Sequence, residues 1–334
     1  MALADRLETA LEARPDEDAP RTLPRNLFRF ILTTTGRHQV LLSLLTGVVF
    51  LLELAPLEIQ RRVVNELTER RDWQVVFWLA AAYGGMALVH GLIKLGLNVY
   101  RGWVSESATR DLRRRAHALC GSPSGTRTLP EESGTQVSMV VAEVEPIGGF
   151  VGAAISEPLL QAGILVTVLS YMFYLEPWLG LVTLAIFLPH IFVVPLIQKV
   201  INRRTHLRVE TLRKVSAGIV AAGTEEGEPS QRGERLIQQV FMLNMGIFKL
   251  KFSMNFIMNL THHLQIAGAL MFGGWLVLNG RIELGTVVAF ISSIGRLNDP
   301  WGDLVNYFRD LSSTLVKYRL VADAIERLCA NRRD

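Results

Sequence analysis

Several polar and ionisable side chains interrupt stretches of sequence that are otherwise apolar. In chain order they are Glu53, His90, Lys94, Asn98, Arg296, Asp299 and Asp303. A charge is costly in a hydrocarbon environment, so each of these residues needs a partner, a water-filled cavity or a role in moving a proton. The chemistry open to the set is therefore ion pairing, binding of a polar molecule, or proton transfer.

These residues fall into three groups along the sequence, and two interpretations are open for each group. His90, Lys94 and Asn98 recur every fourth residue, which places them on one face of a helix. They form a polar stripe that lines a cavity, or Lys94 extends its amine to the headgroups. Glu53 faces a cavity or pairs with a neighbouring helix, and the cavity is the interpretation we favour.

The third group has the same ambiguity near the end of the chain. Arg296, Asp299 and Asp303 surround Pro300 and form a self-neutralising face toward a central pathway, or the apolar stretch ends at Ile294 and they lie in water. The neighbouring His262 and His263 point about 100° apart on a helix. We therefore predict no metal site.

Composition indicates the kind of element that must hold these residues. The chain has 334 residues, of which 49% are hydrophobic and 20% charged, and its mean hydropathy is +0.27. The apolar residues come in blocks of about 20, enough to cross a hydrocarbon core as a helix. This pattern excludes a secreted disulfide module and argues against a soluble enzyme. The predicted spans are residues 39–59, 75–100, 155–175, 178–197, 256–279 and 284–308.

The segments outside the spans predict how the chain lies in the membrane. Residues 1–24 are a polar lead-in, residues 25–37 suit a short helix in the membrane interface, and residues 331–334 are a tail. Short loops on one side carry few basic residues, whereas most of the 35 Lys and Arg residues lie on the other side. Both termini are therefore expected in the cytoplasm. The basic residues of the short loops are Arg61, Arg62, Arg70, Arg71 and Arg281.

Two long connections follow the second and fourth spans, and each is predicted to be mostly helical. The second helix continues through residues 100–119, and the chain turns at 121–130 and returns as a helix from about 133. The second connection repeats this plan, with helix at 201–222 and a turn at 223–230. About 20 extra residues carry a helix ~30 Å beyond the bilayer. The fold class predicted is an all-α membrane protein with six long helices and two elbows.

This layout resembles the transmembrane domain of a six-helix ABC exporter over residues 25–330. Local similarities lie at residues 54–65, which contain Pro56, at residues 129–144 around Gly134, and at residues 297–304. Residues 311–330 resemble the helix that leads into the ATPase in fused members. The resemblance implies one half of an alternating-access pathway, completed by a second copy or a related half and powered by ATPase domains. It implies a bacterial inner membrane or a plasma membrane as the location.

The printed sequence contains no ATPase motif of its own. No lysine follows a glycine, which a phosphate-binding P-loop requires, and the Ser-Gly-Gly signature of these ATPases is absent. We therefore expect no enzymatic activity and no cofactor in this chain, with ATP and magnesium entering only through a partner ATPase. Lipids are further expected partners, and nucleic acid is not.

The two elbows differ in charge, and the difference keeps other functions open. Ser122, Thr126 and Leu129 mark a weakly charged first elbow, which has Pro123 and Pro130 near its ends. The second elbow is acidic, which departs from the family pattern; its acidic residues are Glu225, Glu226 and Glu228. That departure favours a proton-driven transporter like the SbmA-type peptide importers, with Glu53 and His90 as relay candidates, or a scaffold that does not transport. The intact helix at 311–330 favours the exporter.

Overall fold

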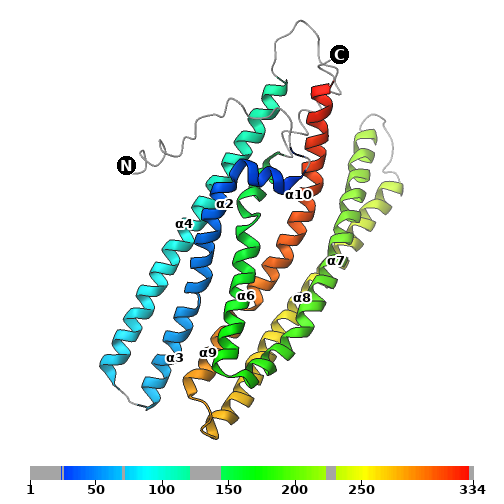
Figure 1. Cartoon of the computed structure of the whole chain (residues 1–334). Coiled ribbons are helices and arrows are strands. Elements are labelled where there is room, and N and C mark those ends of the chain that lie inside the picture. Colours follow the sequence, from blue (N-terminus) through cyan, green and yellow to red (C-terminus); the bar gives the residue numbers. More distant parts are fainter. Residues whose placement is uncertain (1–23, 25, 70–71, 121–143, 223–230, 331–334) are drawn as a thin grey trace. The chain divides into compact units, whose positions relative to one another are not determined.

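The computed structural model describes residues 24, 26–69, 72–120, 144–222 and 231–330. Every regular element in this part of the chain is an α-helix, which confirms the predicted all-α class. The labelled helices are α2 (Leu27–Leu52), α3 (Leu54–Glu69), α4 (Trp73–Cys120), α6 (Ser156–Leu175), α7 (Pro177–Ala222), α8 (Gln231–Leu278), α9 (Leu284–Gly295) and α10 (Asn298–Ala330) (Figure 1). Residues 144–153 are also helical.

Three helices are far longer than a bilayer requires. Helices α4 and α8 have 48 residues each and α7 has 46, so each is about 70 Å long. A hydrocarbon core is only about 30 Å thick. The predicted continuation of the second and fourth spans is therefore confirmed up to Cys120 and Ala222. No proline interrupts α4 or α8, whereas α7 stays continuous through Pro189 and Pro195.

The third and fourth predicted spans are joined by a tight hairpin. Helix α6 ends at Leu175, α7 begins at Pro177, and only Glu176 lies between them. Proline suits the first position of a helix because its missing N–H has no intrahelical partner there. The two helices pack against each other.

Two of the predicted spans are interrupted, contrary to the sequence prediction. The span predicted at 39–59 breaks at Glu53, between α2 and α3, and the span predicted at 284–308 breaks at Arg296 and Leu297, between α9 and α10. In both places a proline follows. Proline cannot bond to the carbonyl four residues earlier and its ring clashes with it. For Pro56 that carbonyl belongs to Leu52, and for Pro300 to Arg296, so each break lies at or next to the carbonyl that loses its N–H partner.

The separate interfacial helix predicted at residues 25–37 is joined to the first span. Helix α2 runs from Leu27 across a kink at Thr35, whose backbone angles (φ −128°, ψ 17°) are not helical. The Thr35 hydroxyl donates a hydrogen bond to the Ile31 carbonyl at 2.8 Å. Such bonds to the preceding turn often bend helices.

Five helical stretches in the described part are long and apolar enough to cross a membrane. They contain the first four predicted spans and all but the last residue of the fifth. The sixth predicted span is not among them, because its helix is divided: α9 has only 12 residues, and α10 begins with the charged Asp299 and Asp303. The prediction of a sixth long helix at residues 284–308 is therefore too simple.

The chain divides into two compact units. One unit comprises Ser43–Leu97 and Ser156–Phe308. Its pairs of packed helices include α7 with α8, which run side by side in Figure 1, and α9 with both α3 and α8. Its buried core is formed by Leu57, Val168, Met172, Leu179, Phe187, Ala269, Phe290, Ile294 and Leu297.

The other unit comprises Met1–Leu42, Asn98–Ile155 and Arg309–Asp334. In its described part the Gln39 amide donates to the Val151 carbonyl at 2.9 Å. The Tyr318 hydroxyl donates to the Pro24 carbonyl at 2.5 Å, and the Tyr318 ring contacts Phe30. Burial raises the pKa of Tyr318 to about 12, so this hydroxyl keeps its proton at neutral pH and remains a donor.

Candidate functional site

Two of the predicted site residues meet where the two helix breaks lie. Glu53 occupies the break between α2 and α3, and Arg296 occupies the break between α9 and α10. The Arg296 guanidinium forms an ion pair with the Glu53 carboxylate, and its Nη1 also donates to the Glu53 backbone carbonyl at 3.3 Å. Arg296 therefore binds both the carboxylate and the backbone carbonyl of Glu53.

His90 of α4 completes this cluster. Its Nε2 lies 3.1 Å from the second carboxylate oxygen of Glu53. The side chains are largely shielded, with exposed fractions of 17% for Glu53, 16% for His90 and 28% for Arg296. We call these three residues the break cluster. The His90 Nε2 is buried and has no hydrogen-bond partner, so its approach to Glu53 is a close polar contact.

A second polar group lies on α6 and α10 in the same unit. The buried Gln161 amide donates to Glu157 at 2.7 Å and to Asp303 at 3.3 Å. Asp303 is also close enough to Asp299 and Lys94 to interact with their charges. Lys94, Asp299 and Asp303 are themselves exposed. Three acids and one lysine are thus gathered near the start of α10.

The remaining predicted site residues are placed differently. Asn98 is exposed and belongs to the other compact unit. The elbow residues Ser122, Thr126, Leu129, Glu225, Glu226 and Glu228 lie outside the described residues. No group of three or more His, Cys, Asp or Glu side chains in the described part is arranged to hold a metal ion.

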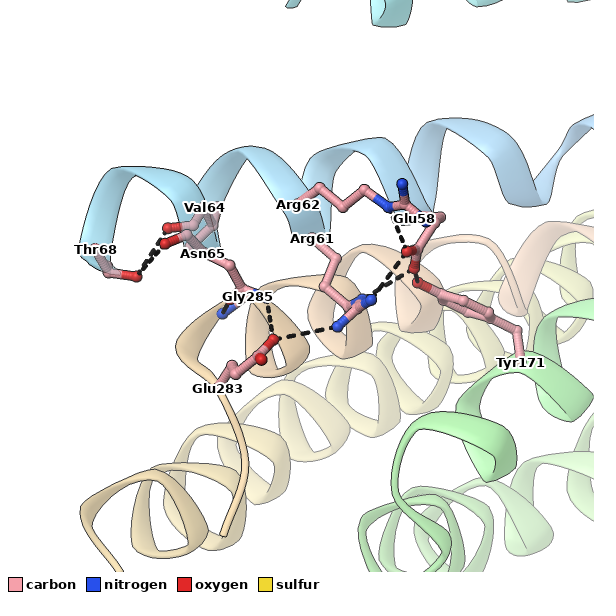
Figure 2. A network of polar contacts seen from close by, with 9 residues as sticks. All are labelled: Glu58, Arg61, Arg62, Val64, Asn65, Thr68, Tyr171, Glu283 and Gly285. Atoms are coloured by element: carbon pink, nitrogen blue, oxygen red, sulfur yellow. Dashed lines mark hydrogen bonds and ion pairs between the residues drawn. The ribbon is translucent and has the colours of Figure 1, made fainter. Parts of the chain in front are cut away.

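A third polar network, on α3, joins that helix to α6 and α9 (Figure 2). The Glu58 carboxylate accepts two hydrogen bonds from Arg61, both at 2.9 Å, and one from Arg62 at 2.7 Å. The Tyr171 hydroxyl of α6 donates to it at 2.9 Å. A carboxylate with a paired guanidinium fork and additional donors is strongly oriented. Glu58 thus fixes α6 against α3.

The same network reaches the start of α9. Arg61 donates to Glu283 at 3.2 Å, and the Asn65 amide also donates to Glu283. The Asn65 Oδ1 accepts the backbone N–H of Gly285 at 2.8 Å. Gly285 is the second residue of α9, and Glu283, which precedes the helix, makes no side-chain cap. Asn65 therefore caps α9 from a different helix.

This network was not among the predicted site residues. The spacing of Glu58 with Arg61 and Arg62, three and four residues apart, is a visible signal for ion pairs within one helix. Nothing local in the sequence pairs Asn65 with Glu283 or Glu58 with Tyr171, because those contacts depend on how separate helices pack. Gln161 was missed for the same reason.

The sequence matches a known protein family. Residues 41–220 match the family described as the ABC transporter transmembrane region. The match covers more than half of the chain. The chain belongs to this family. It is an integral membrane component of an ABC transporter, as the resemblance at residues 25–330 predicted. None of the curated proteins searched matches the sequence.

The matched region of this ABC transmembrane chain runs from α2 to the end of α7. It includes Glu53 and His90 of the break cluster and the α3 and α6 residues of the Glu58 network, but not Arg296, Asp303, Glu283 or Gly285. The assignment therefore rests on the sequence of the part of the chain from α2 to α7. The break cluster adds a feature that depends on α9 and α10 as well.

Proposed function

We propose that this chain forms one half of an alternating-access pathway of an ABC exporter, driven by ATPase domains that are not part of the printed sequence. The observation that carries the proposal is the length of α4, α7 and α8. Each continues about 40 Å farther than the apolar core needs. Helices of that length can transmit movement between a nucleotide-driven domain and the membrane.

The basic residues support the orientation of these extensions. Arg110, Arg113, Arg114 and Arg115 lie beyond the apolar part of α4, and Arg203, Arg204 and Arg208 lie beyond that of α7. Clusters of arginine next to a span favour the cytoplasmic side. We therefore place both elbows, both termini and the partner ATPase in the cytoplasm of a cell whose inner or plasma membrane holds the protein.

The exposure of α8 supports a paired assembly. Among the described residues, the most apolar 18-residue stretch of α8 has no buried residue. Lipid can cover such a helix, and so can the second half of a transporter. A pathway of the size implied by the family needs two halves, so we propose a dimer with itself or with a related chain.

The alternating-access proposal is tested by chemical accessibility. After Cys120 and Cys329 are replaced by serine, a single cysteine is placed as Lys94→Cys on the polar face of α4. We expect a membrane-impermeant maleimide to label it from the cytoplasmic side without nucleotide and from the outer side with ATP and vanadate. The measurement is the labelled fraction in right-side-out and inverted vesicles from cells that contain the partner ATPase.

Leu92→Cys is the matched control, because it lies on α4 about 200° around from Lys94 and is also exposed. A lipid-facing cysteine reacts poorly from either side, with or without nucleotide. Equal labelling at both positions contradicts a polar pathway at Lys94. Labelling at Lys94 that never changes sides with ATP contradicts nucleotide-driven alternating access.

A further inference from the structure

We propose that the break cluster is a proton-binding site in which Arg296 and a proton on His90 compete for the single negative charge of Glu53. The inference rests on contacts within one compact unit. It requires neither an ATPase partner nor a particular direction of transport.

The first step is the charge balance of the cluster. With Arg296 paired, the opposite charges of Glu53 and Arg296 cancel. Shielded sites in a membrane tolerate net charge poorly. If Arg296 moves away, the negative charge of Glu53 is left beside His90. Uptake of one proton by the His90 imidazole then restores neutrality.

The second step is that both partners of the ion pair lie at helix breaks. Arg296 lies at the break between α9 and α10, and Glu53 lies at the break between α2 and α3. A proline follows each break and leaves one nearby carbonyl without an N–H partner. Discontinuous helices with charged residues at their breaks are a common way to build ion sites inside membranes. Movement of α10 at its break separates Arg296 from Glu53 without unwinding a continuous helix.

The other charged groups nearby do not replace either competitor. Glu58 of α3 is occupied by Arg61, Arg62 and Tyr171. On α8, His262 is bonded to Asn298 at 3.0 Å. Nearby, Asp303 of α10 interacts with the charges of Lys94 of α4, Glu157 of α6 and Asp299 of α10. These charges contribute only to the general electrostatic field around the break cluster, whereas Arg296 and His90 contact the Glu53 carboxylate itself.

The site is tested by following the protonation of His90 by ¹⁵N NMR of the full chain in lipid bilayers, assigned by its loss in His90→Gln. Arg296→Gln imitates departure of the arginine. We expect it to raise the proton affinity of His90 about tenfold or more, the effect of removing an adjacent opposite charge. Glu53→Gln is expected to lower that affinity, and Arg296→Lys to keep it close to wild type. Unchanged histidine signals elsewhere show that a variant is folded.

Lys94→Gln is the matched control, because it removes a positive charge one turn from His90 on the same helix. Its effect on His90 is expected to be several-fold smaller. Equal effects of Arg296→Gln and Lys94→Gln on the proton affinity of His90 overturn the proposal. They would mean that His90 responds only to the general electrostatic field and not to Arg296 in particular.

The competition between Arg296 and the proton is tested by measuring the distance between α2 and α10, the helices that adjoin the two breaks. Spin labels at Val48 of α2 and Phe308 of α10, both exposed, report this distance after Cys120 and Cys329 are replaced by serine. If a proton on His90 displaces Arg296, lowering the pH from 8 to 5 is expected to add a second, displaced population. His90→Gln is expected to remove that pH dependence. A wild-type distance that is the same at pH 5 and pH 8 overturns the exchange of arginine for a proton.

Discussion

At the scale of single residues, Asn65 shows how one side chain positions a neighbouring helix. The first turn of a helix has N–H groups without intrahelical partners. In α9 the Gly285 N–H is such a group, and Asn65 of α3 accepts it at 2.8 Å (Figure 2). A β-carbon at Gly285 would collide with Asn65 and with the Arg61 carbonyl, so the two helices meet at backbone distance.

Asn65→Ala is predicted to lower the free energy of unfolding by about 1 kcal/mol, the typical cost of losing a helix cap. The measurement is thermal unfolding of the purified protein in detergent. Thr68→Ala is the control one turn along α3, because the Thr68 hydroxyl bonds only to carbonyls of its own helix. That change is expected to be neutral or slightly stabilising. If the two variants lose equal stability, the cap has no special role.

At the scale of elements, the helix at residues 144–153 packs closely on α4. A β-carbon at Gly152 would collide with the Arg101 carbonyl and the Ser105 hydroxyl, and one at Gly148 would collide with Thr109. Small residues four apart allow such close packing of membrane helices. The four-residue spacing is visible in the sequence, whereas the helix that it contacts is not.

Gly152→Ala is therefore predicted to destabilise the protein by about 1–3 kcal/mol, because the backbone of α4 cannot yield as a flexible side chain could. Gly149→Ala on the same helix is the matched control, since nothing lies within 4 Å of its added carbon. It is expected to stabilise the helix by about 0.5–1 kcal/mol through reduced backbone freedom. Both effects are measured as shifts in the unfolding temperature, and a shift of the same sign in both variants contradicts the close contact.

The same scale shows how much of the fold could be predicted. Helices α4 and α7 were predicted nearly to their ends, because apolar blocks followed by proline-free polar helix leave little choice. The breaks at Glu53 and at Arg296–Leu297 were missed. Pro56 and Pro300 were noted in the sequence, but prolines also occur at 189 and 195 inside the continuous α7. Whether a proline breaks a helix or bends it depends on what its neighbours supply to the freed carbonyl.

At the scale of the whole molecule, the break cluster illustrates what the sequence leaves open. Glu53, His90 and Arg296 were each predicted to need a partner or a cavity, on the general cost of charge in a membrane. The structure makes them one another's partners. Residues 53 and 296 are separated by 243 positions, so no local pattern joins them. The cluster forms because the breaks at Glu53 and Arg296 meet each other and Glu53 lies beside His90 of α4.

The last prediction concerns the elbows and the partner ATPase implied by the proposed function. Glu225, Glu226 and Glu228 make the second elbow acidic, and burying them in a groove costs desolvation unless basic groups meet them. We expect Thr126→Cys in the first elbow to crosslink to the ATPase more strongly than Gly227→Cys during ATP turnover. Crosslinking at Gly227 should weaken as salt rises, because salt screens an acidic contact. The measurement is crosslinked yield at 0.05 and 0.5 M salt in the cysteine-free background. Equal yields at both positions, unaffected by salt, would show that the second elbow couples through apolar contacts despite its charge.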